Sequence, residues 1–235
     1  MAAMGAIAPA FAADMPVKAV LKAPPPVITW TGCYIGANVG GGWADKHYVD
    51  PLAVPPADLG SHSPRGIVGG GQVGCDYQAG MFLIGVQGMF QGADLNGQHN
   101  SVDRFVTHIP WLATATVRLG LVVDPRVVLY VKGGGAWVRD KEDIFDIVTG
   151  LREATADVTR SGWIVGFGGE MIAWSGWSIF VEYNYMDFGN RAVTFTNVEI
   201  PPVPPTFPLN IRQTVQTLVA GINFRFGPGA VVAKY

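Results

Sequence analysis

The chain is poor in charge for its length and has no long apolar run. Only 14% of its 235 residues are charged, against roughly 25% in soluble domains, while 49% are apolar. No segment approaches the ~18 uncharged apolar residues that a membrane-spanning helix needs. High apolar content without such a run favours a transmembrane β-barrel, in which lipid-facing residues alternate with polar ones.

Cysteine and net charge are also scarce. Two cysteines, Cys33 and Cys75, are too few for a disulfide framework or a thiolate zinc site. An oxidising periplasm would still permit one bridge between them. The net charge of −2 provides no basic surface for nucleic acid, so we expect no nucleic-acid partner.

What the chain does contain is alternation with a period of two, the pattern of half-exposed β-strands. In the last segment Leu218, Ile222 and Phe224 alternate with residues such as Asn223 and Arg225. Eight segments follow this pattern: residues 33–43, 67–79, 82–92, 111–121, 128–137, 163–173, 178–186 and 216–226.

The connections between these segments alternate in length. Tight turns are expected around Gly80, Asp124-Pro125 and Ser175-Gly176, and long loops over 44–65, 94–108, 140–160 and 189–209. Short periplasmic turns and long external loops are typical of outer-membrane barrels. The sequence therefore predicts an all-β fold over residues 30–226, an eight-stranded antiparallel up-and-down transmembrane β-barrel. Tryptophans near the expected strand ends, Trp30 among them, would form interfacial girdles.

Three stretches carry a family resemblance: "WTGCYIGANVGGGW", the hairpin opened by "SGWIVGFGGEM", and the closing "GINFRF". They resemble the small outer-membrane barrels of alphaproteobacteria, relatives of the OmpA barrel and the opacity proteins, over about residues 28–235. The resemblance implies location in the bacterial outer membrane among its lipids and lipopolysaccharide. It also implies insertion by an assembly machinery that reads a terminal strand ending in an aromatic residue. Because the chain runs past Phe226, either Phe226 or Tyr235 is the candidate assembly signal.

The two ends have a different composition from the barrel. Residues 1–12 end in Ala10-Phe11-Ala12, an A-x-A cleavage site without a positive n-region, which predicts the remnant of a signal peptide; an apolar tail is the alternative. Residues 13–29 form a Pro-rich periplasmic segment that could meet a protein partner, and residues 227–235 form a C-terminal tail.

Two motifs suggest chemistry that their context does not support. Gly69, Gly71 and Gly74 match G-x-G-x-x-G, but no helical pattern follows them, so they are better explained as small residues in a narrow barrel or beside a bulky neighbour. The histidines match no metal motif and are expected as solvated loop residues; they are His47, His62, His99 and His108. We expect no catalytic residue, metal or cofactor.

The inward-facing charges are the candidate site. Arg118 and Lys132 flank one expected turn, and Glu170 and Glu182 flank another, so that Lys132 is expected near Glu170. An eight-stranded barrel is just wide enough to be filled by side chains, and opposite charges inside it should pair and plug it. The OmpA barrel has a similar charged interior. The pairs could act as a gate or as structural packing, and packing is favoured.

The cysteines share the lipid-facing parity. If Trp43 lies opposite Arg65, the same register places Cys33 opposite Cys75, where a disulfide is geometrically possible.

These features predict a non-enzymatic integral outer-membrane protein with a structural or surface-interaction role, whose external loops could meet a protein partner. The alternatives are a small channel and a membrane-embedded enzyme acting on lipid.

Overall fold

The computed structural model describes residues 28–100, 104–198 and 206–227, and the regular structure in these ranges is strand. No helix long and apolar enough to cross a membrane occurs among these residues. The strands are β1 (Gly32–Asp50), β2 (Ala57–His62), β3 (Arg65–Ala79), β4 (Phe82–Asn100), β5 (Arg104–Asp124), β6 (Val127–Phe145), β7 (Arg152–Trp174), β8 (Trp177–Asn197) and β9 (Thr206–Phe226).

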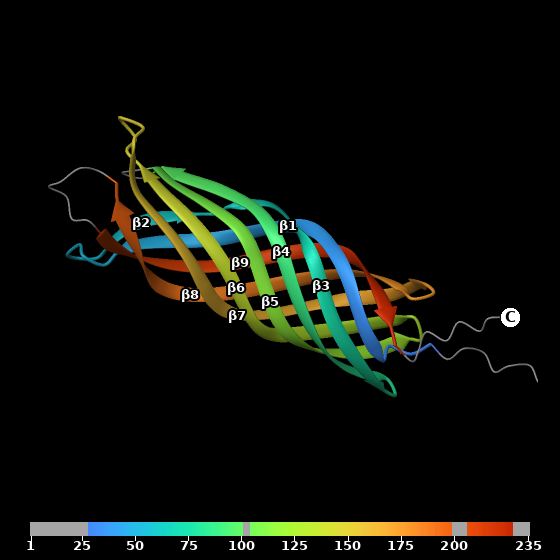
Figure 1. The fold of residues 1–235 in the computed structure, drawn as a ribbon. Helices are drawn as coiled ribbons and strands as arrows, with labels where there is room; N and C mark the ends of the chain where they lie inside the picture. Colours follow the sequence, from blue (N-terminus) through green and yellow to red (C-terminus); the bar gives the residue numbers. More distant parts are fainter. Residues whose placement is uncertain (1–27, 101–103, 199–205, 228–235) are drawn as a thin grey trace, which may run out of the picture.

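The strands close into an antiparallel ring (Figure 1), because β9 pairs with β1 from Cys33 to Val49. The short β2 pairs with β1 just beyond the residues that β3 occupies, so β2 and β3 together form one broken strand. The break lies at Pro64, which has no N–H to donate; its carbonyl accepts from the Ala44 N–H at 2.8 Å. The ring therefore has eight positions, which confirms the predicted fold class.

Strand stagger can be followed around the ring. We start at Phe226 on β9 and step from each residue to its partner on the next strand, through Cys33, Cys75 and Val86. After one circuit the path reaches β9 again at Gln216, so the stagger is ten residues. Stagger and strand number together fix the width of a barrel, and eight strands leave an interior that side chains fill.

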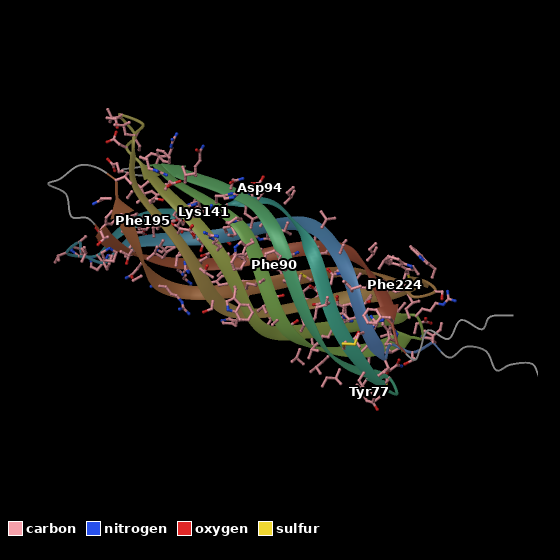
Figure 2. All side chains as sticks on the ribbon, viewed as in Figure 1. Tyr77, Phe90, Asp94, Lys141, Phe195 and Phe224 are labelled. Atoms are coloured by element: carbon pink, nitrogen blue, oxygen red, sulfur yellow. A yellow bond between two sulfur atoms is a disulfide. The ribbon has the colours of Figure 1, made fainter. Side chains whose placement is uncertain are left out.

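Apolar side chains cover the outside of the ring, as the alternation predicted. Ile35, Val86 and Val131 are each more than half exposed, whereas inward Tyr34, Gln87 and Lys132 are buried. Figure 2 shows the labelled Tyr77, Phe90 and Phe224 on this outer face. We call this outward apolar surface the belt.

The two ends of the barrel differ. At the turn end, the tight connections follow Ala79, Asp124 and Trp174, and here β1 begins and β9 ends (Figure 1). The opposite end is the rim end. Residues 1–27 and 228–235, which include the predicted signal remnant, most of the Pro-rich segment and Tyr235, lie outside the described residues.

The predicted long loops at the rim end were wrong in extent. The strands continue through most of them, and the connection between β6 and β7 is only 146–151. Alternation persists there, with Asp140, Glu142 and Ile144 buried on β6. Charged residues on both faces concealed the period of two that an apolar-against-polar pattern reveals.

Candidate functional site

The barrel interior near the turn end holds a cluster of four charges, which we call the lower cluster: Asp76, Arg118, Glu170 and Arg225. Arg118 Nη2 lies 2.9 Å from Glu170 Oε2, and Arg225 Nη1 lies 2.8 Å from Glu170 Oε1. Arg225 Nη2 also contacts Asp76 Oδ2 at 2.5 Å. Two acids therefore balance two bases in a buried site, the condition under which buried charge is tolerated.

Neutral groups complete the lower cluster. Ser178 Oγ and Asn223 Nδ2 donate to Glu170 Oε1 at 2.6 and 3.0 Å, and Arg118 Nη1 donates to Tyr34 Oη at 3.0 Å. Multiple charge-assisted hydrogen bonds of this kind fix the geometry of buried ion pairs.

A separate ion pair lies beside the lower cluster. Lys132 Nζ is 2.6 Å from Glu182 Oε1, and both side chains are fully buried. Gln87 Oε1 accepts from Lys132 at 2.9 Å, and Tyr130 Oη donates to Glu182 Oε2 at 3.0 Å.

The four lumen residues predicted from sequence all face this interior, but one expected pairing is wrong. Lys132 contacts Glu182, whereas Glu170 contacts Arg118 and Arg225. The register explains the difference: Glu170 lies opposite Val128, and Lys132 lies opposite Gly166. The expected pairing assumed that residues at similar distances from their turns lie at the same height. The stagger between neighbouring strands makes this assumption wrong.

Sequence reasoning did not assign Asp76 and Arg225 to the network. Both have the inward parity of their strands, and that parity was the available signal.

Trp30 closes the turn end from inside. It was expected in an interfacial girdle, but its side chain is fully buried and packs with Leu83, Val128 and Tyr130. The Arg225 guanidinium lies 4.8 Å from its ring centroid and donates to its carbonyl at 3.0 Å. Trp30 therefore packs against the lower cluster, held there by the cation–π contact and the hydrogen bond from Arg225.

An apolar layer lies above the lower cluster. On β6 its residues Ala136 and Val138 stand between Lys132 and Asp140, and on β7 Ile164 stands between Glu170 and Arg160. The layer comprises Ala44, Val68, Leu95, Ile109, Leu112, Ala136, Val138, Ile164, Met186, Phe188, Val215 and Val219; Phe180, which belongs to the same apolar cluster, lies opposite Glu170 at the level of the lower cluster.

A second group of buried charges, the upper cluster, lies nearer the rim end. Lys46 Nζ contacts Asp140 at 3.0 Å and Glu142 at 2.7 Å, and Arg160 Nη1 donates to Gln213 at 3.0 Å. A second apolar group that includes Phe105, Phe195 and Leu209 packs around the upper part of the interior.

The histidines lie in different environments. His62 is buried, stacks on Tyr48 with ring centroids 5.4 Å apart, and lies 3.1 Å from Thr107 Oγ1, so its expected solvation was wrong. His47 and His108 are exposed beside Asp58 and Asp94, at 3.7 and 3.8 Å. The side chain of His99 lies outside the described residues, and the described part of the chain holds no group of three or more potential metal ligands.

Gly69, Gly71 and Gly74 lie within β3, which continues directly into the hairpin with β4. Gly74 faces inward, and a Cβ there would collide with the Tyr34 hydroxyl. This glycine makes room for a bulky side chain of the lower cluster.

The cysteines and Phe226 meet on the outer face. Cys33 lies opposite Cys75 on one side and opposite Phe226 on the other. The two cysteines form a disulfide with a Cα–Cα distance of 3.9 Å. The Phe226 side chain is half exposed.

Comparison with known proteins identifies close and distant likenesses. The sequence profile of a family described as outer membrane protein beta-barrel domain matches residues 1–201. The 31 kDa outer-membrane immunogenic proteins of Brucella melitensis and Brucella suis are each 30% identical over 233 residues, which covers 92% of this chain and 93% of theirs. The crystal structure of the outer membrane protease OmpT from Escherichia coli gives a TM-score of 0.50 at 9% identity, covering 84% of this chain and 98% of that one. At that identity the likeness is one of fold alone.

Proposed function

The chain belongs to the outer membrane protein beta-barrel family and lies in the bacterial outer membrane, and we propose that it acts there as a closed, non-enzymatic barrel that presents a surface at its rim end. Its belt contacts the lipids and lipopolysaccharide of that membrane. The family and location are those that the sequence motifs predicted.

The packed interior is the observation that carries the proposal. An ion or solute that entered from the turn end would meet Trp30, then the lower cluster, then the apolar layer. Each member of that layer is at most 3% exposed. A charge pays a large penalty where it can neither be hydrated nor paired, so the apolar layer is the stronger barrier to ions. The proposal therefore modifies the sequence hypothesis: ion pairs fill the lumen, and apolar side chains seal it.

The exposed histidines support a non-enzymatic role. His47 and His108 lie beyond hydrogen-bond distance of Asp58 and Asp94, and His108 Nδ1 is instead 2.8 Å from Asn96 Oδ1. A general base held by a carboxylate normally makes a direct hydrogen bond to it. Purified barrel incubated with labelled phospholipid should leave the lipid intact; release of labelled fatty acid would contradict this part of the proposal.

The rim-end connections support a surface role because they expose apolar side chains. Val54 is 98% and Val148 92% exposed. The turn that carries Val148 is ordered by Asp146, which accepts from the N–H groups of Val148 and Thr149. These hydrogen bonds, that from Thr149 first, hold the pKa of the Asp146 carboxyl below its usual range. Figure 1 shows this hairpin, in yellow, projecting beyond its neighbours. The Brucella relatives are named as immunogenic, and exposure of the corresponding end would account for that property.

Labelling of single cysteines tests which end faces outward. In a Cys33→Ala, Cys75→Ala background, Val148→Cys should react with a membrane-impermeant maleimide on intact cells. The matched variant Arg126→Cys, in the turn between β5 and β6, should react only after the outer membrane is permeabilised. The opposite pattern would show that the rim end faces the periplasm, and would contradict the proposed surface role.

We propose further that the outer-membrane assembly machinery reads Phe226. Its side chain is outward at the end of the strand that closes the ring, next to β1. Phe226→Ser should reduce the folded barrel in outer-membrane fractions several-fold, measured as the heat-modifiable band on gels. Deletion of 227–235 should leave that band unchanged. If the deletion alone abolishes assembly, Tyr235 carries the signal.

A further inference from the structure

The Cys33–Cys75 disulfide lies on the outer wall of the barrel, among the apolar side chains of the belt. The two residues border a groove of about 750 Å³ that they share with Ile35, Val73, Val86 and Phe226. All six have the outward parity of their strands, and in Figure 2 the yellow sulfur–sulfur bond lies toward the end that carries Tyr77 and Phe224. Tyr77 and Phe82, both outward and more than 60% exposed, continue the belt beyond the disulfide toward the turn end.

Disulfide formation needs a charged thiolate and direct access for an oxidant, and lipid around the two cysteines would prevent both. The attacking group is a thiolate, and a charge inside hydrocarbon is costly. The oxidant, another protein's disulfide, is water-soluble and must approach the sulfur directly. Once lipid covers the belt, neither requirement is met.

Before insertion both requirements are met, because the unfolded chain is in water. One cysteine thiolate attacks a sulfur of the oxidant's disulfide and releases the other oxidant sulfur as a thiolate. The second cysteine thiolate then attacks the mixed disulfide and displaces the oxidant. The chain has lost two electrons and two protons, and the oxidant leaves as a dithiol.

From this position we infer that the Cys33–Cys75 bond is made in the periplasm before the barrel enters the membrane, by exchange with a protein disulfide, and that insertion then closes it to exchange. The inference depends on the location of the chain and not on its proposed surface role. It also gives the bond a place in assembly. If the bond forms before insertion, it joins β1 to β3, at a sequence separation of 42, before the ring closes at the pairing of Cys33 with Phe226.

The test compares oxidation before and after insertion. The full chain is reduced, folded from urea into liposomes, freed of reductant and treated with glutathione disulfide; remaining thiols are alkylated and counted by mass spectrometry. The same reduced chain in urea should oxidise readily. In the inserted barrel we expect Cys33 and Cys75 to oxidise about 100-fold more slowly, the factor that corresponds to placing a charge inside a bilayer. A reduced chain that fails to insert, while the oxidised chain inserts, supports the same order of events.

The register offers a matched control. His47 and Ser61 face each other on β1 and β2 with the same outward parity, but near the rim end, where Ser61 and the His47 side chain are exposed and His47 lies beside Asp58. With Cys33 and Cys75 replaced by alanine, His47→Cys and Ser61→Cys should oxidise after insertion nearly as fast as in urea. Comparable rates for the native and control pairs in liposomes would overturn the inference, as would glutathione adducts on inserted Cys33. An inert control pair would also overturn it, because barrel rigidity and not lipid would then prevent the reaction.

Discussion

Replacing Glu182 with alanine is expected to lower the free energy of unfolding of the barrel by roughly 3–5 kcal/mol. The change leaves the Lys132 ammonium, which is fully buried and 2.6 Å from the carboxylate, without its counter-charge. An uncompensated buried charge costs more than the intact pair contributes, so the loss comes mainly from the stranded lysine. Urea unfolding in lipid or detergent, followed by tryptophan fluorescence, measures the effect.

A double-mutant cycle separates this pair from its surroundings. Adding Lys132→Ala to Glu182→Ala should recover part of the loss, with a coupling energy above about 1 kcal/mol. The matched cycle uses Lys132 and Glu170, which lie in the same interior but make ion pairs with different partners, and should give a coupling below about 0.5 kcal/mol. Equal coupling in both cycles would mean that the charges interact through a wet, diffuse lumen and not through the observed pairs.

Truncating side chains of the apolar layer should lower the free energy of unfolding about as much as Glu182→Ala does. Unlike Glu182→Ala, it should also make the barrel permeable to ions. Phe188 is 2% exposed within that layer, and Phe188→Ala is expected to cost about 3–5 kcal/mol because it removes buried surface and leaves a cavity. Combining Phe188→Ser with Leu112→Ser, also in the layer, should let water through it and produce ionic current in planar bilayers.

Two variants control for that result. Phe167→Ala removes a phenylalanine that is 60% exposed on the outer face, and should produce no current. Lys132→Met combined with Glu182→Gln neutralises an ion pair and leaves the apolar layer intact, and should also produce no current. A current from this second variant would show that the ion pairs, as the sequence alone suggested, form the seal.

The wall of the barrel could be predicted from sequence because the polarity of each strand residue indicates whether its side chain faces outward or inward. Ile35, Val131 and Phe224 face outward, and Tyr34, Lys132 and Asn223 face inward, as period-two alternation requires. The tight turns at Gly80 and Gly176 followed from local chemistry, and both glycines adopt the positive φ that such turns favour.

The interior could not be predicted in the same way, because it depends on the stagger between strands. Lys132 and Glu182 meet across strands that are not neighbours, and Arg225 joins Glu170 to Asp76 across the closure of the ring. Period-two counting identifies which side chains point inward but not their relative height. Trp30 was misplaced for a related reason, since nothing in its local sequence indicates that its side chain packs into the interior against Leu83, Val128 and Tyr130.

Single-channel recording of the wild-type barrel tests the central claim most directly. Purified full-length protein, folded and inserted into planar bilayers, should add no discrete or steady current at any applied voltage that the bilayer tolerates. The expectation follows from an interior filled by Trp30, the lower cluster and the apolar layer. Reproducible unitary steps from wild-type protein, absent from bilayers that received the unfolded chain, would contradict a closed barrel and favour a small channel.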